Sequence, residues 1–180
     1  MHWPSRYHAR LKEEFRCRRP VIWGRLKAWW DDQDLDLPGG FDAVLNWWGS
    51  FGYFDDDTNR EVLRGFADVL VPGGRVLIDQ VNRERILRDF RSKGVATYGG
   101  VKVTTRNRWD PEGKRINGSW LFEKDGRRAR RRSSIRLYTP AEMRSLMESA
   151  GFALEFICDG KTGLPFNRGS SRMTAVGRKR

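Results

Sequence analysis

The stretch FDAVLNWWGSFGYF, residues 41–54, begins like a buried strand and changes character at Asn46. Its first five residues are apolar except for Asp42, which suits a strand that is covered on both faces. After Asn46 the sequence WWGSFG combines large aromatic rings with small residues. Ligands of open parallel sheets bind beyond the carboxyl ends of the strands, so this loop predicts a pocket wall. The alternative is that the aromatic rings only plug the end of the sheet.

The segment downstream of this loop has the pattern of a parallel crossover. TNREVLRGFADVL predicts a helix over residues 58–70, with a capping box formed by Thr58 and Glu61. The PGG sequence at 72–74 is expected to end this helix and turn the chain into a strand at 75–79. A strand, a helix and a strand in this order predict a right-handed connection within one sheet.

The segments on either side of this crossover also contain helix and strand patterns. Residues 5–19 have helical spacing, and VIW at 21–23 is read as a short strand. A helix is expected at 83–92, followed by an antiparallel meander over 101–138. TPAE then predicts a capped helix up to Gly151, and FALEFIC and RMTAVGRK predict two final strands.

Composition narrows the class of protein. The 180 residues fit a single domain, and 38% hydrophobic residues are enough to build a core. Two cysteines and two histidines predict neither a disulfide framework nor a metal site. No apolar run is long enough to span a bilayer, and MHWPSRYHAR lacks the apolar centre of a signal peptide, so we expect a cytoplasmic protein without a membrane partner.

The net charge of +12 is unevenly distributed. Residues 1–30 carry eight basic and two acidic residues (+6), residues 31–79 carry three and eleven (−8), and residues 80–180 carry twenty-four and ten (+14). Basicity is greatest in GRRARRRSSIR, residues 126–136. This run predicts either contact with phosphates or a solvated edge hairpin, and the hairpin is favoured.

Three motifs together resemble class I S-adenosylmethionine-dependent methyltransferases. They are FDAVLNWWGSFGYF, LRGFADVLVPGGRVLID and YTPAEMRSLMESAGFALEFI. The resemblance implies an α/β fold with an incomplete Rossmann-like sheet, mostly parallel with a terminal antiparallel hairpin. It also implies an antiparallel insert at about residues 100–138 within a single domain over residues 1–180. Among members of this family, small-molecule N- or O-methyltransferases are the most similar.

The resemblance also implies site residues and S-adenosylmethionine as the cofactor. Asp42 matches the acid of the family's strand, and Asp31 matches an acid that contacts the adenine amino group. His8 is the only imidazole placed to act as a base, and no general base is assigned. Asn82 ends the strand 75–79 near the substrate side. The residues expected to contact the cofactor are Asp31, Asn46, Trp47, Gly49 and Ser50, and those expected to contact the substrate are Trp48, Tyr53 and Asp79.

The N-terminal end departs from this family. The chain has no GxGxG sequence, and the first helical pattern resembles the family helix that follows the ribose-binding acid. The resemblance therefore implies an N-terminally truncated methyltransferase that lacks the cofactor's Gly-rich turn. We expect the strand 41–46 to have an unpaired edge, which is covered either by rearranged local chain or by a second copy in a homo-oligomer.

Three functions remain open from the sequence. The first is methyl transfer from S-adenosylmethionine to a small-molecule N or O acceptor. The second is a non-catalytic binding or assembly module that retains part of the fold. The third is a basic RNA-binding protein, which is not favoured because the aromatic residues are not interleaved with the arginines.

Overall fold

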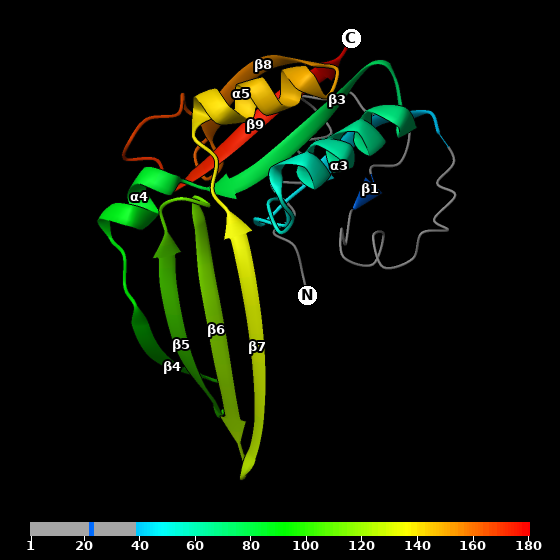
Figure 1. The fold of residues 1–180 in the computed structure, drawn as a ribbon. Coiled ribbons are helices and arrows are strands. Elements are labelled where there is room, and N and C mark those ends of the chain that lie inside the picture. The colour runs from blue at the N-terminus through cyan, green and yellow to red at the C-terminus, as the bar shows by residue number, and fades with distance from the viewer. Residues whose placement is uncertain (1–21, 24–38) are drawn as a thin grey trace.

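The computed structural model describes residues 22–23 and 39–180 and contains two separate sheets (Figure 1). The larger sheet has five strands in the order β1-β2-β3-β9-β8. The β1/β2 and β2/β3 pairs are parallel, whereas β3/β9 and β9/β8 are antiparallel, so this sheet is mixed rather than mostly parallel. Its strands are β1 (Ile22–Trp23), β2 (Phe41–Asn46), β3 (Leu70–Val81), β8 (Phe152–Asp159) and β9 (Arg172–Lys179).

The outer edge of β2 is paired over part of its length. Ile22 pairs with Val44 and Trp23 with Leu45, which confirms the short strand expected within 21–23. This edge of β2 is therefore covered by local chain, which supplies a parallel neighbour, and cover by a second copy stays a prediction. The helix expected at 5–19 lies outside the described residues.

Two helices cover one face of the five-stranded sheet (Figure 1). Helix α3 (Asp56–Val69) contributes Val62, Leu63 and Phe66 to the main core, and helix α5 (Pro140–Ser149) contributes Met143 and Met147. The opposite face carries a second, smaller apolar cluster, because successive strand residues point to opposite sides of a sheet. No helix in the described part of the chain is long and apolar enough to cross a membrane.

Helix α3 starts earlier than expected. Its N-cap is Asp55, whose carboxylate accepts a hydrogen bond from the Thr58 backbone N–H at 2.8 Å. The predicted capping box of Thr58 and Glu61 is wrong, since both residues lie inside the helix. An aspartate is an equally good N-cap, and the acids of the first turn suit the positive end of the helix dipole.

The PGG sequence does not form the predicted turn before β3. Helix α3 ends at Val69 and the strand begins at Leu70, so Pro72 lies within β3. The register shifts here: Phe41 pairs with Leu70, but Ala43 pairs with Arg75. The extra residues bulge out of the ladder, as glycines and prolines in strands commonly do.

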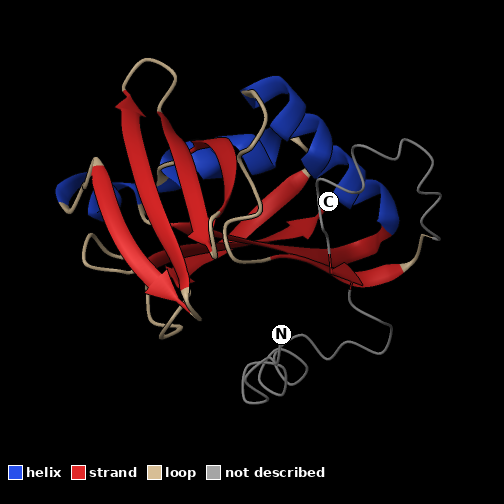
Figure 2. Ribbon diagram, turned by 90° about the horizontal axis from the view of Figure 1, so that it is seen from below, coloured by secondary structure: helices blue, strands red, loops and turns tan. Residues whose placement is uncertain are grey.

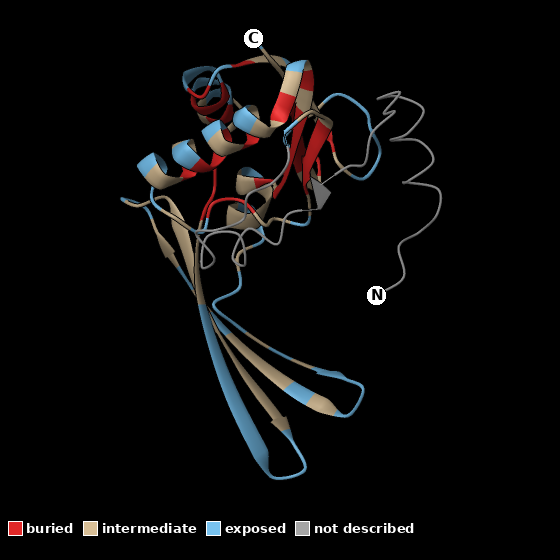
Figure 3. Ribbon diagram, turned by 90° about the vertical axis from the view of Figure 1, so that its right-hand side faces the viewer, coloured by how far each residue is buried: buried red, intermediate tan, exposed pale blue. Residues whose placement is uncertain are grey.

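The second sheet is an antiparallel meander inserted between β3 and α5. Figures 2 and 3 show it projecting from the body of the protein, with residues that are mostly half-buried or exposed. The meander is longer than the predicted insert because residues 93–98 form a strand and the preceding helix is short. The short helix α4 (Arg83–Arg88) precedes the meander. The strands of the meander are β4 (Lys93–Tyr98), β5 (Val101–Asp110), β6 (Arg115–Lys124) and β7 (Arg127–Arg136).

The predicted start of the last helix is confirmed. Thr139 and Glu142 form a reciprocal capping box, and Pro140 occupies the first turn of α5. The hairpin of β8 and β9 then completes the five-stranded sheet.

Candidate functional site

The candidate site lies where β2 and β3 end side by side. Asn46, the last residue of β2, pairs with Ile78 in β3. Asp79 follows Ile78 at the same end of the sheet. The loop 47–54 is tied across this end because the Gly49 N–H donates to the Asp79 carbonyl at 3.0 Å. The strand exit predicted to shape a pocket is thus the exit of two adjacent parallel strands.

Asn46 has a buried amide with no hydrogen-bond partner in the described part of the chain. Its residue is 1% exposed, and neither Oδ1 nor Nδ2 has a hydrogen bond to any described residue. Buried polar groups are nearly always paired, and an unpaired one costs about 1–3 kcal/mol. At the end of β2 this amide therefore has an acceptor and two donors that no described residue uses.

The two tryptophans of the loop have different environments. Trp47 is half-buried and packs against the small cluster of Leu45, Leu77 and Val176. Trp48 is 72% exposed and has a φ of 62°, and Gly49 continues the left-handed turn with a φ of 70°. Trp48 does not plug the sheet, so its ring is available at the surface beside the strand ends.

Asp79 holds this left-handed turn in place. The carboxylate is fully buried and accepts from the Trp48 backbone N–H at 2.9 Å and from the Thr174 hydroxyl at 3.1 Å. Arg172 contacts it through Nη2 at 2.6 Å, and the guanidinium of Arg172 lies 5.7 Å from the centre of the Trp48 ring. Asp79 thus positions the loop, and its contact with a substrate stays a prediction.

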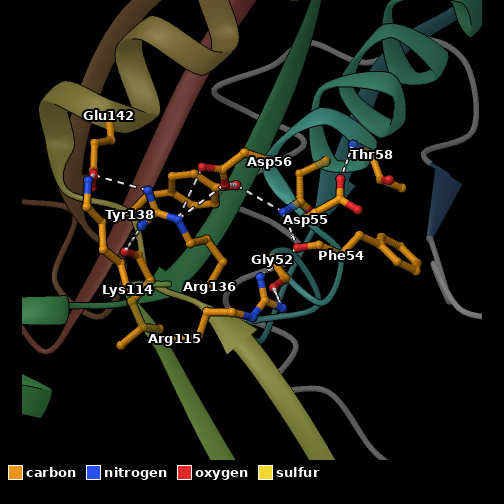
Figure 4. Close-up of polar contacts among 12 residues, drawn as sticks. Gly52, Phe54, Asp55, Asp56, Thr58, Lys114, Arg115, Arg136, Tyr138 and Glu142 are labelled. Atoms are coloured by element: carbon orange, nitrogen blue, oxygen red, sulfur yellow. Dashed lines mark hydrogen bonds and ion pairs between the residues drawn. The ribbon is translucent and has the colours of Figure 1, made fainter. Parts of the chain in front are cut away.

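The second half of the loop is held by the inserted sheet. Arg115 of β6 donates to the carbonyls of Phe54 at 2.8 Å, Tyr53 at 3.0 Å and Gly52 at 3.2 Å (Figure 4). The Gly52 carbonyl also accepts from the Arg136 backbone N–H at 2.7 Å. One arginine therefore fixes three successive carbonyls and couples the loop to the insert.

Glu142 is the centre of a cluster of charges beside this loop (Figure 4). It accepts from Lys114 at 2.6 Å, from Arg83 at 3.0 Å and from Arg136 at 3.1 Å. Burial alone would raise the pKa of the Glu142 carboxyl. The hydrogen bonds from Lys114, the Thr139 backbone and Arg136 outweigh burial and lower this pKa to about 2.

Asp56, at the start of α3, connects to the same cluster. It accepts from Arg136 Nε at 3.2 Å and from the Tyr138 hydroxyl at 2.6 Å. Burial first, and then the Asp56 carboxylate, raise the pKa of the Tyr138 phenol well above its usual value. Tyr138 therefore remains a hydrogen-bond donor over the whole physiological pH range.

The other predicted site residues are placed as follows. Ser50 donates its hydroxyl to a carbonyl within the loop at 2.8 Å, and the side chain of Tyr53 is on the surface. Asn82 is buried and caps α4. Asp31 and His8 lie outside the described residues, so their predicted roles are untested.

No sequence pattern links Arg115, Arg136 and Glu142 to one another. Glu142 was assigned only to a helix cap, and Arg136 was the last residue of a run read as phosphate-binding or solvated. No local signal marks Arg136 as buried, because the apolar neighbours Ile135 and Leu137 are expected on the opposite face of a strand.

Comparisons of sequence give short partial matches. No family model matches the chain. A chemotaxis protein methyltransferase from Klebsiella aerogenes is 39% identical over 67 residues, covering 37% of this chain and 23% of that protein. A histidine–tRNA ligase from Christiangramia forsetii is 28% identical over 102 residues, covering 52% of this chain and 22% of that protein. The chain spans less than a quarter of either protein.

Comparisons of structure agree on one fold. An S-adenosylmethionine-dependent methyltransferase from Clostridium acetobutylicum has a TM-score of 0.72 at 13% identity, covering 97% of this chain and 70% of that one. The CcbJ methyltransferase from Streptomyces caelestis has 0.69 at 18%, covering 81% and 64%. The sugar N-methyltransferase KedS8 from Streptoalloteichus has 0.54 at 22%, covering 82% and 59%. The chain therefore has a methyltransferase-like α/β fold.

Replacing Gly52 with alanine is expected to lower the free energy of unfolding by about 2 kcal/mol or more. Gly52 has a φ of +98°, and an added Cβ would lie 2.5 Å from the Arg136 carbonyl oxygen. The left-handed backbone alone costs a non-glycine residue about 1–2 kcal/mol. Urea unfolding measures the change. The control is Gly126→Ala, whose φ is +74° but whose Cβ would meet nothing within 4 Å; equal losses in both variants would contradict the close approach.

Glu142→Gln is expected to flatten the acid dependence of stability. The pKa of Glu142 is near its ordinary 4.5 in the unfolded chain and about 2 in the folded protein. The stability it adds is complete above pH 4.5 and is lost as pH falls from 4.5 towards 2. Urea midpoints across this window should fall less steeply for the variant. The control is Glu148→Gln, at an exposed position of the same helix; parallel pH curves for wild type and Glu142→Gln would refute the assignment.

Proposed function

We propose that this protein binds S-adenosylmethionine at the end of β2 and directs methyl transfer to a nitrogen or oxygen of a small-molecule acceptor. The observation that carries the proposal is the buried, unpaired amide of Asn46 at the exit of two parallel strands in a methyltransferase-like fold. A chain that only needed to fold would gain by pairing or replacing this amide.

The residues after β2 fit the cofactor's chemical groups. The Asn46 amide can donate and accept, the exposed Trp48 ring supplies a flat surface, and the left-handed turn at Gly49 lets backbone approach a ligand closely. Trp47 forms the apolar floor beside Leu45. Asp31 remains the proposed adenine contact, and Ser50 and Tyr53 line the same loop.

The contribution of this chain to the reaction is to hold and shield the reacting groups. S-adenosylmethionine, when bound, supplies a methyl group that its sulfonium already activates. The protein then has to align the acceptor and exclude water, and tethered loops serve this purpose. The loop 47–54 is tied to β3 by Asp79 and to the insert by Arg115. The name of KedS8, a sugar N-methyltransferase, makes amino sugars the first acceptors to test.

The second candidate is a non-catalytic module with the same fold. It is favoured because the sequence has no GxGxG motif. In the methyltransferases that this chain resembles, the turn formed by that motif lets the backbone contact the cofactor. Isothermal titration with S-adenosylmethionine decides between the two candidates. Saturable heat of binding, followed by transfer of labelled methyl to an amino sugar, supports the enzyme. Absence of binding at millimolar cofactor supports the module.

Asn46→Ala is expected to weaken binding of S-adenosylmethionine by about tenfold, without lowering the stability of the free protein. A hydrogen bond contributes about 0.5–1.5 kcal/mol, and about 1.4 kcal/mol is tenfold in affinity. Since the amide has no hydrogen-bond partner within residues 39–180, the variant loses no hydrogen bond to that part of the chain in the free state. Titration and urea unfolding give the two quantities.

The matched control is Asn82→Ala, which also removes a buried amide without changing the charge. Its amide is also buried but donates to the Ser170 carbonyl at 2.8 Å. This variant should lose stability, because the Ser170 carbonyl is left unpaired. The proposal fails if Asn46→Ala binds the cofactor as tightly as the wild type.

A further inference from the structure

The two faces of the inserted sheet differ in chemistry. The register places Val103, Phe122 and Ala129 opposite one another on one face, together with Trp120. A cavity of about 440 Å³ lies on this apolar face. The other face, here called the arginine face, carries seven exposed cations and one carboxylate, Glu123, outward of the cross-strand row Asp110–Arg115–Arg136. The cations are Lys93, Lys102, Arg106, Arg108, Arg128, Arg130 and Arg132.

Most of these cations form two rows. Lys102, Arg106 and Arg108 lie along β5, and alternate residues of β7 from Arg128 to Arg132 form the second row. The strand between them, β6, has Asn117, Ser119 and Leu121 on this face. Two strand spacings separate the rows by about 10 Å. The arginine face therefore has a central strand, β6, bordered by one row of cations on β5 and another on β7.

The positive charge of this face is largely uncompensated. Glu123 contacts Arg128 at 3.0 Å and Lys102 at 4.0 Å. Within residues 39–180 the other five cations have no ion pair. Lys93 lies directly opposite Arg106 in the β4/β5 ladder, an arrangement of like charges that destabilises a sheet. The excess is six positive charges, seven cations less one carboxylate, on a single exposed face.

An acidic surface on a second copy of this chain is a less suitable partner. The exposed carboxylates Asp57 and Glu61 of α3 are already paired with Arg60 at 2.8 Å and Arg64 at 2.6 Å. A polymer with evenly spaced anions can instead contact both rows along their length. The large aromatic residues of the insert are on the apolar face, so the arginine face has no ring on which a base could stack.

We propose that the arginine face binds a nucleic-acid strand through its sugar–phosphate backbone. Contacts to phosphates alone give an affinity that is independent of base sequence and falls steeply with salt. Six phosphate contacts to a single strand correspond to a slope of log K against log salt of about −4. This surface lies on the insert and is independent of the proposed cofactor site at the end of β2.

The test is fluorescence anisotropy of labelled single-stranded RNA and DNA of mixed sequence, titrated with the full chain over a range of salt. The double variant Arg130→Gln/Arg132→Gln should bind about tenfold or more weakly at 0.1 M salt. Its slope should be smaller in magnitude by about 1.4, because each lost phosphate contact removes about 0.7. RNA and DNA should bind alike within a few-fold.

The matched control is Arg127→Gln/Arg131→Gln, which removes the same charge from the same strand but from the apolar face. It should retain most of the affinity and nearly the whole salt slope. Thermal melting of both variants excludes unfolding as the cause. Equal losses in the two variants, no binding at low salt, or full competition by polyglutamate at equal charge would overturn the proposal. Cofactor titration of the arginine variants should be unchanged.

Discussion

Arg136 is the residue through which the parts of this structure are joined. Its guanidinium is buried, with a side chain 6% exposed, and it contacts Asp56 on α3 and Glu142 on α5. Its backbone N–H holds the loop carbonyl of Gly52. A buried guanidinium is tolerated only when its donors are paired, and here they are paired by groups from separate segments. The position of the insert relative to the two helices depends on this pairing.

The loop after β2 is consequently restrained from two sides. The buried Asp79 carboxylate binds the backbone of Trp48, and Arg115 binds the carbonyls from Gly52 to Phe54. Both restraints act on backbone atoms, so neither uses the Trp48 ring, which is 72% exposed, or the Asn46 amide, which is buried. A site held in this way loses little conformational entropy on binding, which is the advantage of preorganisation.

Local sequence patterns predicted most of the elements, β4 excepted, but not their connections. The bounds of β2 and the capping box at Thr139 follow from apolar runs and capping residues, and both were predicted. The continuation of α3 directly into β3 was not, because proline and glycine normally indicate a turn, whereas here the neighbouring strand absorbs them as a bulge. The contact of Arg136 with Asp56 joins residues 80 positions apart, and no local pattern indicates it. Within a basic run, the residue type alone does not show which arginine is buried and which is exposed.

Two departures from the rules of ordinary folding, among others such as the unpaired Oδ1 of buried Asn59, lie in different parts of the molecule. The amide of Asn46 is buried without a partner at the sheet end, and Lys93 faces Arg106 in the insert. Each raises the free energy of the isolated chain, so stability alone explains neither. Violations of this kind are expected where a protein meets another molecule. The buried Asn46 amide would be satisfied by the small polar groups of a ligand. The like charges of Lys93 and Arg106 would be stabilised by an extended anion on an open surface. These demands are chemically distinct, which is why one ligand cannot satisfy both.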